Sequence, residues 1–100
     1  MATFPFSLIT PEGKLFQGEV ESVIAPGALG SFGVLVRHAP IISALKQGVL
    51  QIKTPERELF FAIDSGVFEM NKEGHAVAII DIAVPSQSYQ EAKTHSIQHT

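Results

Sequence analysis

The sequence predicts an all-β domain, a sandwich or barrel of packed strands. Short apolar segments are separated every eight to twelve residues or so by glycine, proline, asparagine or aspartate, which is the spacing of strands and turns in such folds. Several segments alternate apolar and polar side chains, the pattern of a strand with one face in the core. The chain is 45% hydrophobic and 17% charged, so it holds enough apolar material to bury a core.

Length and composition limit what this domain can do. One hundred residues suffice for one core and are too few for two. A net charge of −3 with interspersed signs argues against a nucleic-acid-binding surface or a polybasic membrane anchor. The absence of cysteine excludes disulfides and thiolate metal sites. The first ten residues do not resemble a signal peptide, and no apolar run approaches the roughly 20 residues that cross a bilayer. We therefore expect membrane contact only through another protein.

The strands are expected in a regular order along the chain. The first is Phe4–Thr10, with Pro5 tolerated near its start or at a sheet edge. A turn at 11–13 leads to two strands separated by Gly18, which we interpret as a bulge. After a glycine-rich region, residues 50–53 alternate apolar and polar side chains. The expected strands are 4–10, 14–17, 19–25, 50–53, 59–63, 68–71 and 75–84.

Two further turns and a kink organise the second half of the chain. Residues 54–56 and 72–74 have the composition of tight turns, and Ser65-Gly66 offers a kink between two strands. The last expected strand, 75–84, is apolar on both faces, the pattern of a strand that is covered on both sides. Asp81 interrupts it, either as a carboxylate that is partly buried or faces a partner, or as an exposed strand end.

Only two segments have helical features. Residues 39–45 are too short and too rich in β-branched side chains to be expected as a helix. In the tail, Ser88 followed by Glu91 fits a capping box, in which each side chain satisfies a free backbone N–H of the first helical turn. Because so few residues remain after this point, we expect a short helical or disordered tail.

The segment 26–33, PGALGSFG, holds three glycines in eight positions and raises the question of a phosphate site. It matches neither GxGxxG nor a Walker A loop. No helix is expected to follow it whose N-terminus would attract a phosphate. We therefore expect tight turns with positive φ at one end of the sandwich.

His38 is the strongest candidate for chemistry. A catalytic base needs a nearby nucleophile or orienting carboxylate, and the sequence offers these only outside any recognisable motif. We expect His38 to support the turn before Pro40 or to lie at a protein–protein surface. His95 and His99 stand four positions apart, as metal ligands on one helix face would. Their segment is poorly helical and offers no third ligand, so we expect exposed or disordered side chains.

The glycines, prolines and histidine between positions 11 and 50 follow an order that resembles a known family. The matching positions are Phe16, Gly18, Val20, Pro26, Gly27, Gly33, Val34, Leu35, His38, Ala39, Pro40, Gly48, Val49 and Leu50. Each short match is common alone, whereas the shared order over about forty positions is specific. Residues 65–69 (SGVFE) extend the match more loosely, to roughly Pro85. The chain resembles the epsilon subunit of bacterial F-type ATP synthase, which is called delta in mitochondria.

The resemblance implies a flattened sandwich of two antiparallel five-stranded sheets over residues 1–85. Residues 86–100 would then be the stub of a helical hairpin that family members commonly carry. With no hairpin to extend along the rotor, the chain is expected to couple the enzyme without inhibiting ATP hydrolysis by that route, and to bind no nucleotide.

The resemblance also implies a role without chemistry of its own. The domain would belong to the rotating central stalk, bind the gamma subunit and the c-ring, and couple proton flow to ATP synthesis. It would hold no catalytic residue, cofactor or metal, and bind no nucleic acid. It would lie on the cytoplasmic side of the bacterial inner membrane, attached only through the complex.

Two contact surfaces follow from the resemblance. The loop 27–33 would touch the polar loops of the c-ring, through Ala28, Leu29, Ser31 and Phe32. Some relatives carry an acidic residue where Ser31 stands, so here we expect a neutral contact that depends little on salt. The gamma subunit would bind exposed apolar side chains around His38, Ile41 and Ile42.

A free-standing module that binds a carbohydrate or another small ligand is the alternative. Such modules usually display aromatic platforms, yet the chain has no tryptophan, and its one tyrosine, Tyr89, lies in the tail. Recovery of gamma in a pull-down would favour the rotor hypothesis over the ligand module.

Overall fold

Ten strands and one short helix make up residues 2–94, the part of the chain that the computed structural model describes. The elements are β1 (Phe4–Thr10), β2 (Gly13–Val20), β3 (Ser22–Gly27), β4 (Gly30–Leu35), β5 (Ile41–Leu45), β6 (Gly48–Lys53), β7 (Glu58–Ile63), β8 (Gly66–Met70), β9 (Ala76–Ile80), β10 (Ala83–Ser86) and α1 (Tyr89–Thr94). The predicted all-β fold is confirmed. His95 and His99 lie outside the described residues.

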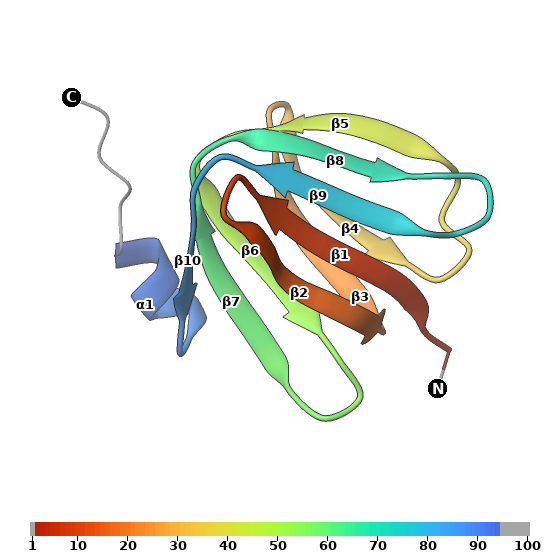
Figure 1. Ribbon diagram of the computed structural model, residues 1–100, viewed down its shortest axis with the longest axis horizontal. Helices are drawn as coiled ribbons and strands as arrows, with labels where there is room; N and C mark the ends of the chain where they lie inside the picture. The colour runs from red at the N-terminus through yellow and green to blue at the C-terminus, as the bar shows by residue number, and fades with distance from the viewer. Residues whose placement is uncertain (1, 95–100) are drawn as a thin grey trace.

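The strands form two layers of five that face each other (Figure 1). Layer A has the order β10-β7-β6-β3-β4, and layer B has the order β5-β8-β9-β1-β2. The layers are joined into one curled sheet, because Gly27 of β3 pairs with Leu45 of β5. All pairs are antiparallel except β1 with β9, which is parallel. The two sheets that were expected are thus continuous with each other. One strand pair is parallel, although all were expected to be antiparallel.

The core lies between the layers and follows from the alternation of side chains. Every second residue of β1 points inward, so that Phe4, Phe6 and Leu8 are buried. Phe6 stacks on Phe68 of β8 with ring centroids 6.1 Å apart. Phe32 of β4 meets Phe68 edge-on at 5.6 Å, so aromatic side chains connect the two layers.

The predicted bulge at Gly18 is wrong. β2 runs unbroken from Gly13 to Val20, and the register slips instead between the pairs Leu8–Phe16 and Ile9–Lys14, which leaves Leu15 as the extra residue. At Gly18 the ring of Phe16 occupies the space beside the backbone, 3.5 Å from where a Cβ would stand. A Cβ there would meet the ring at an ordinary van der Waals distance, and Gly18 pairs in regular register with Phe6, so no bulge requires this glycine.

The predicted strand 75–84 is two strands. β9 ends at Ile80 and β10 begins at Ala83, because the chain crosses from layer B to layer A between them. The crossing is fixed by backbone hydrogen bonds, from Asp81 N to Ser65 O (3.2 Å) and from Asp64 N to Ile82 O (3.1 Å). Asp81 is exposed at the end of the strand, which was one of the two alternatives predicted for this residue.

The predicted turns are confirmed, and their polar side chains hold them. The Thr54 hydroxyl accepts hydrogen bonds from the backbone N–H of Glu56 (3.2 Å) and of Arg57 (3.0 Å). Asn71 Oδ1 accepts from the backbone N–H of Glu73 and of His75, both at 3.0 Å. Such local bonds compete with regular structure and so favour a change of direction.

Residues 41–45, which we did not expect to be helical, form strand β5 against β8. The helix predicted from the capping box is α1. Ser88 Oγ accepts from the Glu91 N–H at 3.1 Å, and Glu91 Oε1 accepts from the Gln87 N–H at 3.1 Å. The helix packs on the outer side of β6, β7 and β10, where Ala92 is buried. This helix has only six residues, and an isolated helix of that length would not persist. It is therefore held by its caps and by its packing on the sheet.

Candidate functional site

The β3–β4 hairpin contains the four residues predicted to contact the c-ring. Its turn is only two residues long, Ala28-Leu29, because β3 continues to Gly27 and β4 begins at Gly30. The expected loop 27–33 is therefore mostly strand, and positive φ occurs here only at Gly30 (140°). A Cβ at Gly27 would stand 2.6 Å from the Gly30 carbonyl oxygen, so this close pairing requires glycine.

The hairpin is anchored on β5. Ala28 N donates to Ala44 O, and Lys46 N donates to Pro26 O, both at 2.9 Å. With its backbone fixed in this way, the turn holds the Leu29 side chain in full contact with solvent. A rigid support with an exposed leucine at its tip is the geometry of a contact point rather than of a flexible loop.

One shallow depression collects most of the residues that the sequence singled out. It is lined by Ala28, Leu29, Gly30, Ser31, Phe32, Ile41, Ile42, Ser43 and Ala44. The four residues predicted for the c-ring thus adjoin two of the three predicted for gamma. Phe32 and Ile41 are half-buried and pack against the core, whereas Leu29 and Ile42 are exposed and are free to meet another surface.

The outer face of layer B continues the exposed apolar surface beyond Ile42. Three side chains define what we call the apolar face: Ile42 on β5, Val67 on β8 and Ile79 on β9, with 74%, 46% and 57% of their surfaces exposed. Strand register joins them, because Val67 pairs with Ala44 on one side and with Ile79 on the other. Glu69, paired with Ile42, places one carboxylate among them.

Val67 and Ile79 were not singled out from the sequence, although a signal was present. Residues 75–84 are apolar on both faces, a pattern we took to mean that both faces are covered. In the structure Ala76, Ala78 and Ile80 fill the core, while Ile79 points outward and is exposed. The pattern is then explained if something outside residues 2–94 covers the outer face.

His38 does not line the depression; it precedes β5, at the end of that strand opposite to the one that holds the hairpin. It lines a hollow of about 490 Å³ between the β4–β5 connection, the β8–β9 turn and the start of β1. Its Nδ1 lies 2.6 Å from Ala39 O, and a hydrogen bond there uses the ring to support the turn, as expected. This contact of the ring is therefore with a carbonyl oxygen and not with an orienting carboxylate.

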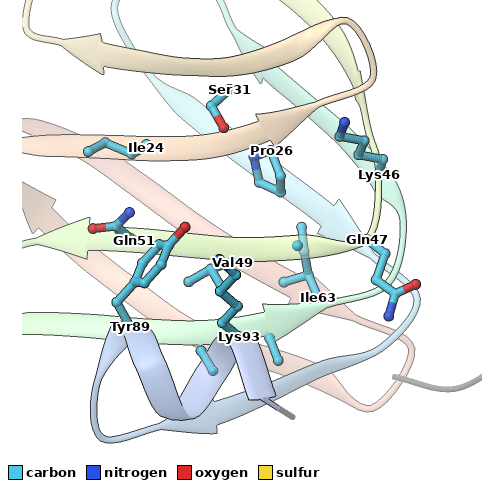
Figure 2. A pocket seen from close by; sticks show the side chains of 13 residues that line it. Ile24, Pro26, Ser31, Lys46, Gln47, Val49, Gln51, Ile63, Tyr89 and Lys93 are labelled. Atoms are coloured by element: carbon cyan, nitrogen blue, oxygen red, sulfur yellow. The ribbon is translucent and has the colours of Figure 1, made fainter. Parts of the chain in front are cut away.

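A cleft of about 390 Å³ separates α1 from β3 and the β5–β6 connection. Figure 2 shows Tyr89 and Lys93 of α1 on one side of it, with Ile24 and Pro26 of β3 on the other. Lys46 and Gln51 add polar atoms to the lining. The described lining contains no carboxylate and only one aromatic ring, so it offers neither paired acids for hydrolysis nor an aromatic platform.

Within residues 2–94, no set of three or more histidine or acidic side chains is placed to hold a metal ion. The same part of the chain has no helix long and apolar enough to cross a membrane. The features that stand out among the described residues are three parts of the surface: the tip of the β3–β4 hairpin, the apolar face, and the hollow that basic side chains line.

Residues 3–85 match the family described as ATP synthase, delta/epsilon chain, β-sandwich domain. The ATP synthase epsilon chain of Nitratiruptor sp. is 39% identical over 94 residues, covering 93% of this chain and 72% of that protein. The epsilon chain of Caulobacter vibrioides is 45% identical over 74 residues, covering 74% of this chain and 86% of that protein.

Two solved structures share the fold. A chain in the mitochondrial ATP synthase of Euglena gracilis (OSCP/F1/c-ring) superposes with a TM-score of 0.79 at 22% identity, covering 85% of this chain. A chain in the Tetrahymena thermophila ATP synthase central stalk and c-ring gives 0.72 at 12% identity, covering 82% of this chain. This chain spans 54% and 66% of those two chains.

Proposed function

The chain belongs to the family of ATP synthase delta/epsilon β-sandwich domains, and we propose that it is a non-catalytic rotor subunit of a proton-translocating F-type ATP synthase. In this role it binds the gamma subunit and the c-ring in the central stalk, and couples proton flow to ATP synthesis. It stays on the cytoplasmic side of a bacterial inner membrane and reaches the membrane only through the complex.

The observation that carries this proposal is an exposed apolar surface on a rigid support. A coupling element must transmit torque without deforming, and close-packed interiors have low compressibility. Here two five-stranded layers share a core in which Phe6, Phe32 and Phe68 interlock. The surface that this support carries runs from Leu29 at the hairpin tip across Ile42 to Ile79.

We assign the hairpin tip to the c-ring. Leu29 and Ala28 are its exposed turn residues, and Ser31 is an exposed neutral side chain of the same hairpin. Contacts between neutral groups are little screened by salt, so this contact is expected to vary weakly with ionic strength. The apolar face, together with His38 just before β5, is left for gamma.

Reconstitution tests the proposal as a whole. An enzyme depleted of its epsilon subunit is combined with this chain, and ATP hydrolysis and proton pumping are followed together. Restored pumping supports a coupling role. Hydrolysis without any gain in pumping, from an enzyme that has bound the chain, would contradict it.

Crosslinking tests the c-ring assignment separately. Cysteine is introduced at Ala28 or at Ser31, and the assembled enzyme is oxidised against cysteines in the polar loops of the ring. We expect crosslinks from both positions and none from a control cysteine at Glu56, which lies in the β6–β7 turn at the other end of β3. Assembly without a crosslink at either hairpin position would remove the assignment.

A further inference from the structure

One residue of the chain adopts a backbone conformation that its type disfavours. Arg37 has φ = 67°, and within residues 2–94 it is the one non-glycine residue with positive φ. It stands third in the turn 35–38, which is closed by a hydrogen bond from His38 N to Leu35 O at 3.1 Å. With positive φ at the third position alone, this is a type II turn, where glycine or asparagine is preferred. A Cβ makes the left-handed region unfavourable.

Within residues 2–94, no ion pair compensates for the backbone strain at Arg37. The Arg37 side chain is exposed, and no carboxylate of residues 2–94 forms an ion pair with it. An arginine kept in a position that favours glycine, without an internal partner, indicates a use for its guanidinium outside the domain.

The surroundings of Arg37 indicate the chemistry of that use. It lines the hollow of His38, which we call the cationic hollow, together with Lys72 and His75. Lys72 also lacks an ion pair with any carboxylate of residues 2–94. Glu73 is the one acidic side chain in the described lining. Arg37 and Lys72 set against Glu73 give the described lining two positive charges and one negative, a net +1 in a chain whose net charge is −3.

The cationic hollow adjoins the apolar face. Pro40 and Lys72 line the hollow, and both also line a depression that contains Ile42 and Glu69. In Figure 1 the β4–β5 connection and the β8–β9 turn lie together at one end of layer B, away from the β3–β4 hairpin. A partner that covers the apolar face from β9 to β5 would therefore have the hollow at its border.

We propose that Arg37 and Lys72 anchor a carboxylate-bearing segment of the partner that covers the apolar face. This inference rests on the proposed function, under which that partner is the gamma subunit. Arginine presents a planar fork of donors that matches a carboxylate in two places at once, and lysine adds a point charge. Rim charges of this kind act mainly on the association rate and on specificity, while apolar side chains supply most of the affinity.

The test uses Arg37→Gly, because glycine fits the turn better than arginine does. We expect the melting temperature to stay the same or to rise by a few degrees, while the affinity for purified gamma falls about tenfold at low salt. Salt should weaken binding of the variant less than binding of the wild type. Lys72→Gln should reduce affinity in the same direction. Arg57→Gly removes the same charge in the β6–β7 turn and should leave binding unchanged.

Each other result contradicts a stated part of the account. Equal binding of gamma by wild type and Arg37→Gly would overturn the inference alone. A large drop in melting temperature for Arg37→Gly would make the arginine structural and would also overturn it. Stabilisation by inorganic phosphate that Arg37→Gly abolishes, with gamma binding unchanged, would assign the hollow to a small anion instead. Failure of the wild-type chain to bind gamma would overturn the proposed function, and this inference with it.

Discussion

The two outer faces of the sandwich differ in what covers them. On layer A, α1 lies over β6, β7 and β10 and buries Ala92 against them. On layer B, the described chain places nothing over Ile42, Val67 and Ile79. Both faces carry apolar side chains between polar ones, so sequence alternation alone does not distinguish them. The difference teaches that one face is completed within the chain and that the other is available to a partner.

The largest expected effect comes from breaking the backbone of layer B. In Gly66→Ala, a Cβ would collide with the Ile79 carbonyl oxygen in the neighbouring strand. Backbone cannot give way as a side chain can, so we expect the free energy of unfolding to fall by about 3 kcal/mol. Urea unfolding measures it. Gly33→Ala is the matched control, since its Cβ would meet only Ile24 Cγ1 at 3.9 Å. Equal stability of the two variants would show that β8 and β9 are less closely joined than described.

The next largest effect is expected from a change that displaces α1 from layer A. Ala92→Asp places a charge beneath α1, where the alanine is 2% exposed. Since the helix can leave the sheet, we expect a loss of about 1–2 kcal/mol rather than the full penalty of a buried charge. Amide hydrogen exchange should show loss of protection in residues 89–94 and along β10. Gln90→Asp puts the same charge on an exposed position of the helix and should leave protection intact. Unchanged exchange in Ala92→Asp would contradict the packing of α1.

Removing the cap of α1 tests the same cover more gently. Ser88→Ala deletes the hydroxyl that accepts from the Glu91 N–H, and we expect docking of the helix to weaken by about 1 kcal/mol. Exchange of the Glu91 amide should accelerate several-fold. Gln87→Ala keeps the backbone N–H that donates to Glu91, so it serves as the control. Equal acceleration in both variants would mean that the serine cap does not hold the helix.

The smallest effect compares the two faces directly. Val67→Thr on layer B replaces one methyl group by a hydroxyl on a residue that is partly wet, so we expect a change below about 0.5 kcal/mol. Val49→Thr places the hydroxyl at the cleft between α1 and layer A, and should cost about 1 kcal/mol more. Thermal unfolding separates the two. A larger cost at Val67 than at Val49 would reverse the assignment of covered and open faces.

Much of the fold was predictable because its signals are local. Turn side chains such as Thr54 and Asn71 act on their own backbone, and Ser88 with Glu91 forms a cap within one helical turn. Each such segment can be interpreted without knowing its neighbours in space.

What could not be predicted depends on partners distant in the sequence. The segment 75–84 breaks at Asp81 because its first part pairs with β8 in layer B and its last part pairs with β7 in layer A. The irregularity of β2 falls at Leu15 and not at Gly18, because the pairing with β1 decides where the register slips. The site was harder still: the strain at Arg37 is a backbone angle, and the apolar face exists only once β5, β8 and β9 are side by side.

The central claim is that the open face of layer B is where gamma binds. The most direct test compares Ile42→Asp with Ile24→Asp, which place the same charge on the two outer faces at residues 74% and 40% exposed. Both variants should fold, which circular dichroism checks, and affinity for purified gamma is then measured by calorimetry. We expect Ile42→Asp to lose at least a hundredfold, since an unpaired charge at an interface costs several kcal/mol, and Ile24→Asp to bind within a few-fold of the wild type. Unchanged affinity of folded Ile42→Asp, or a greater loss in Ile24→Asp, would contradict the claim.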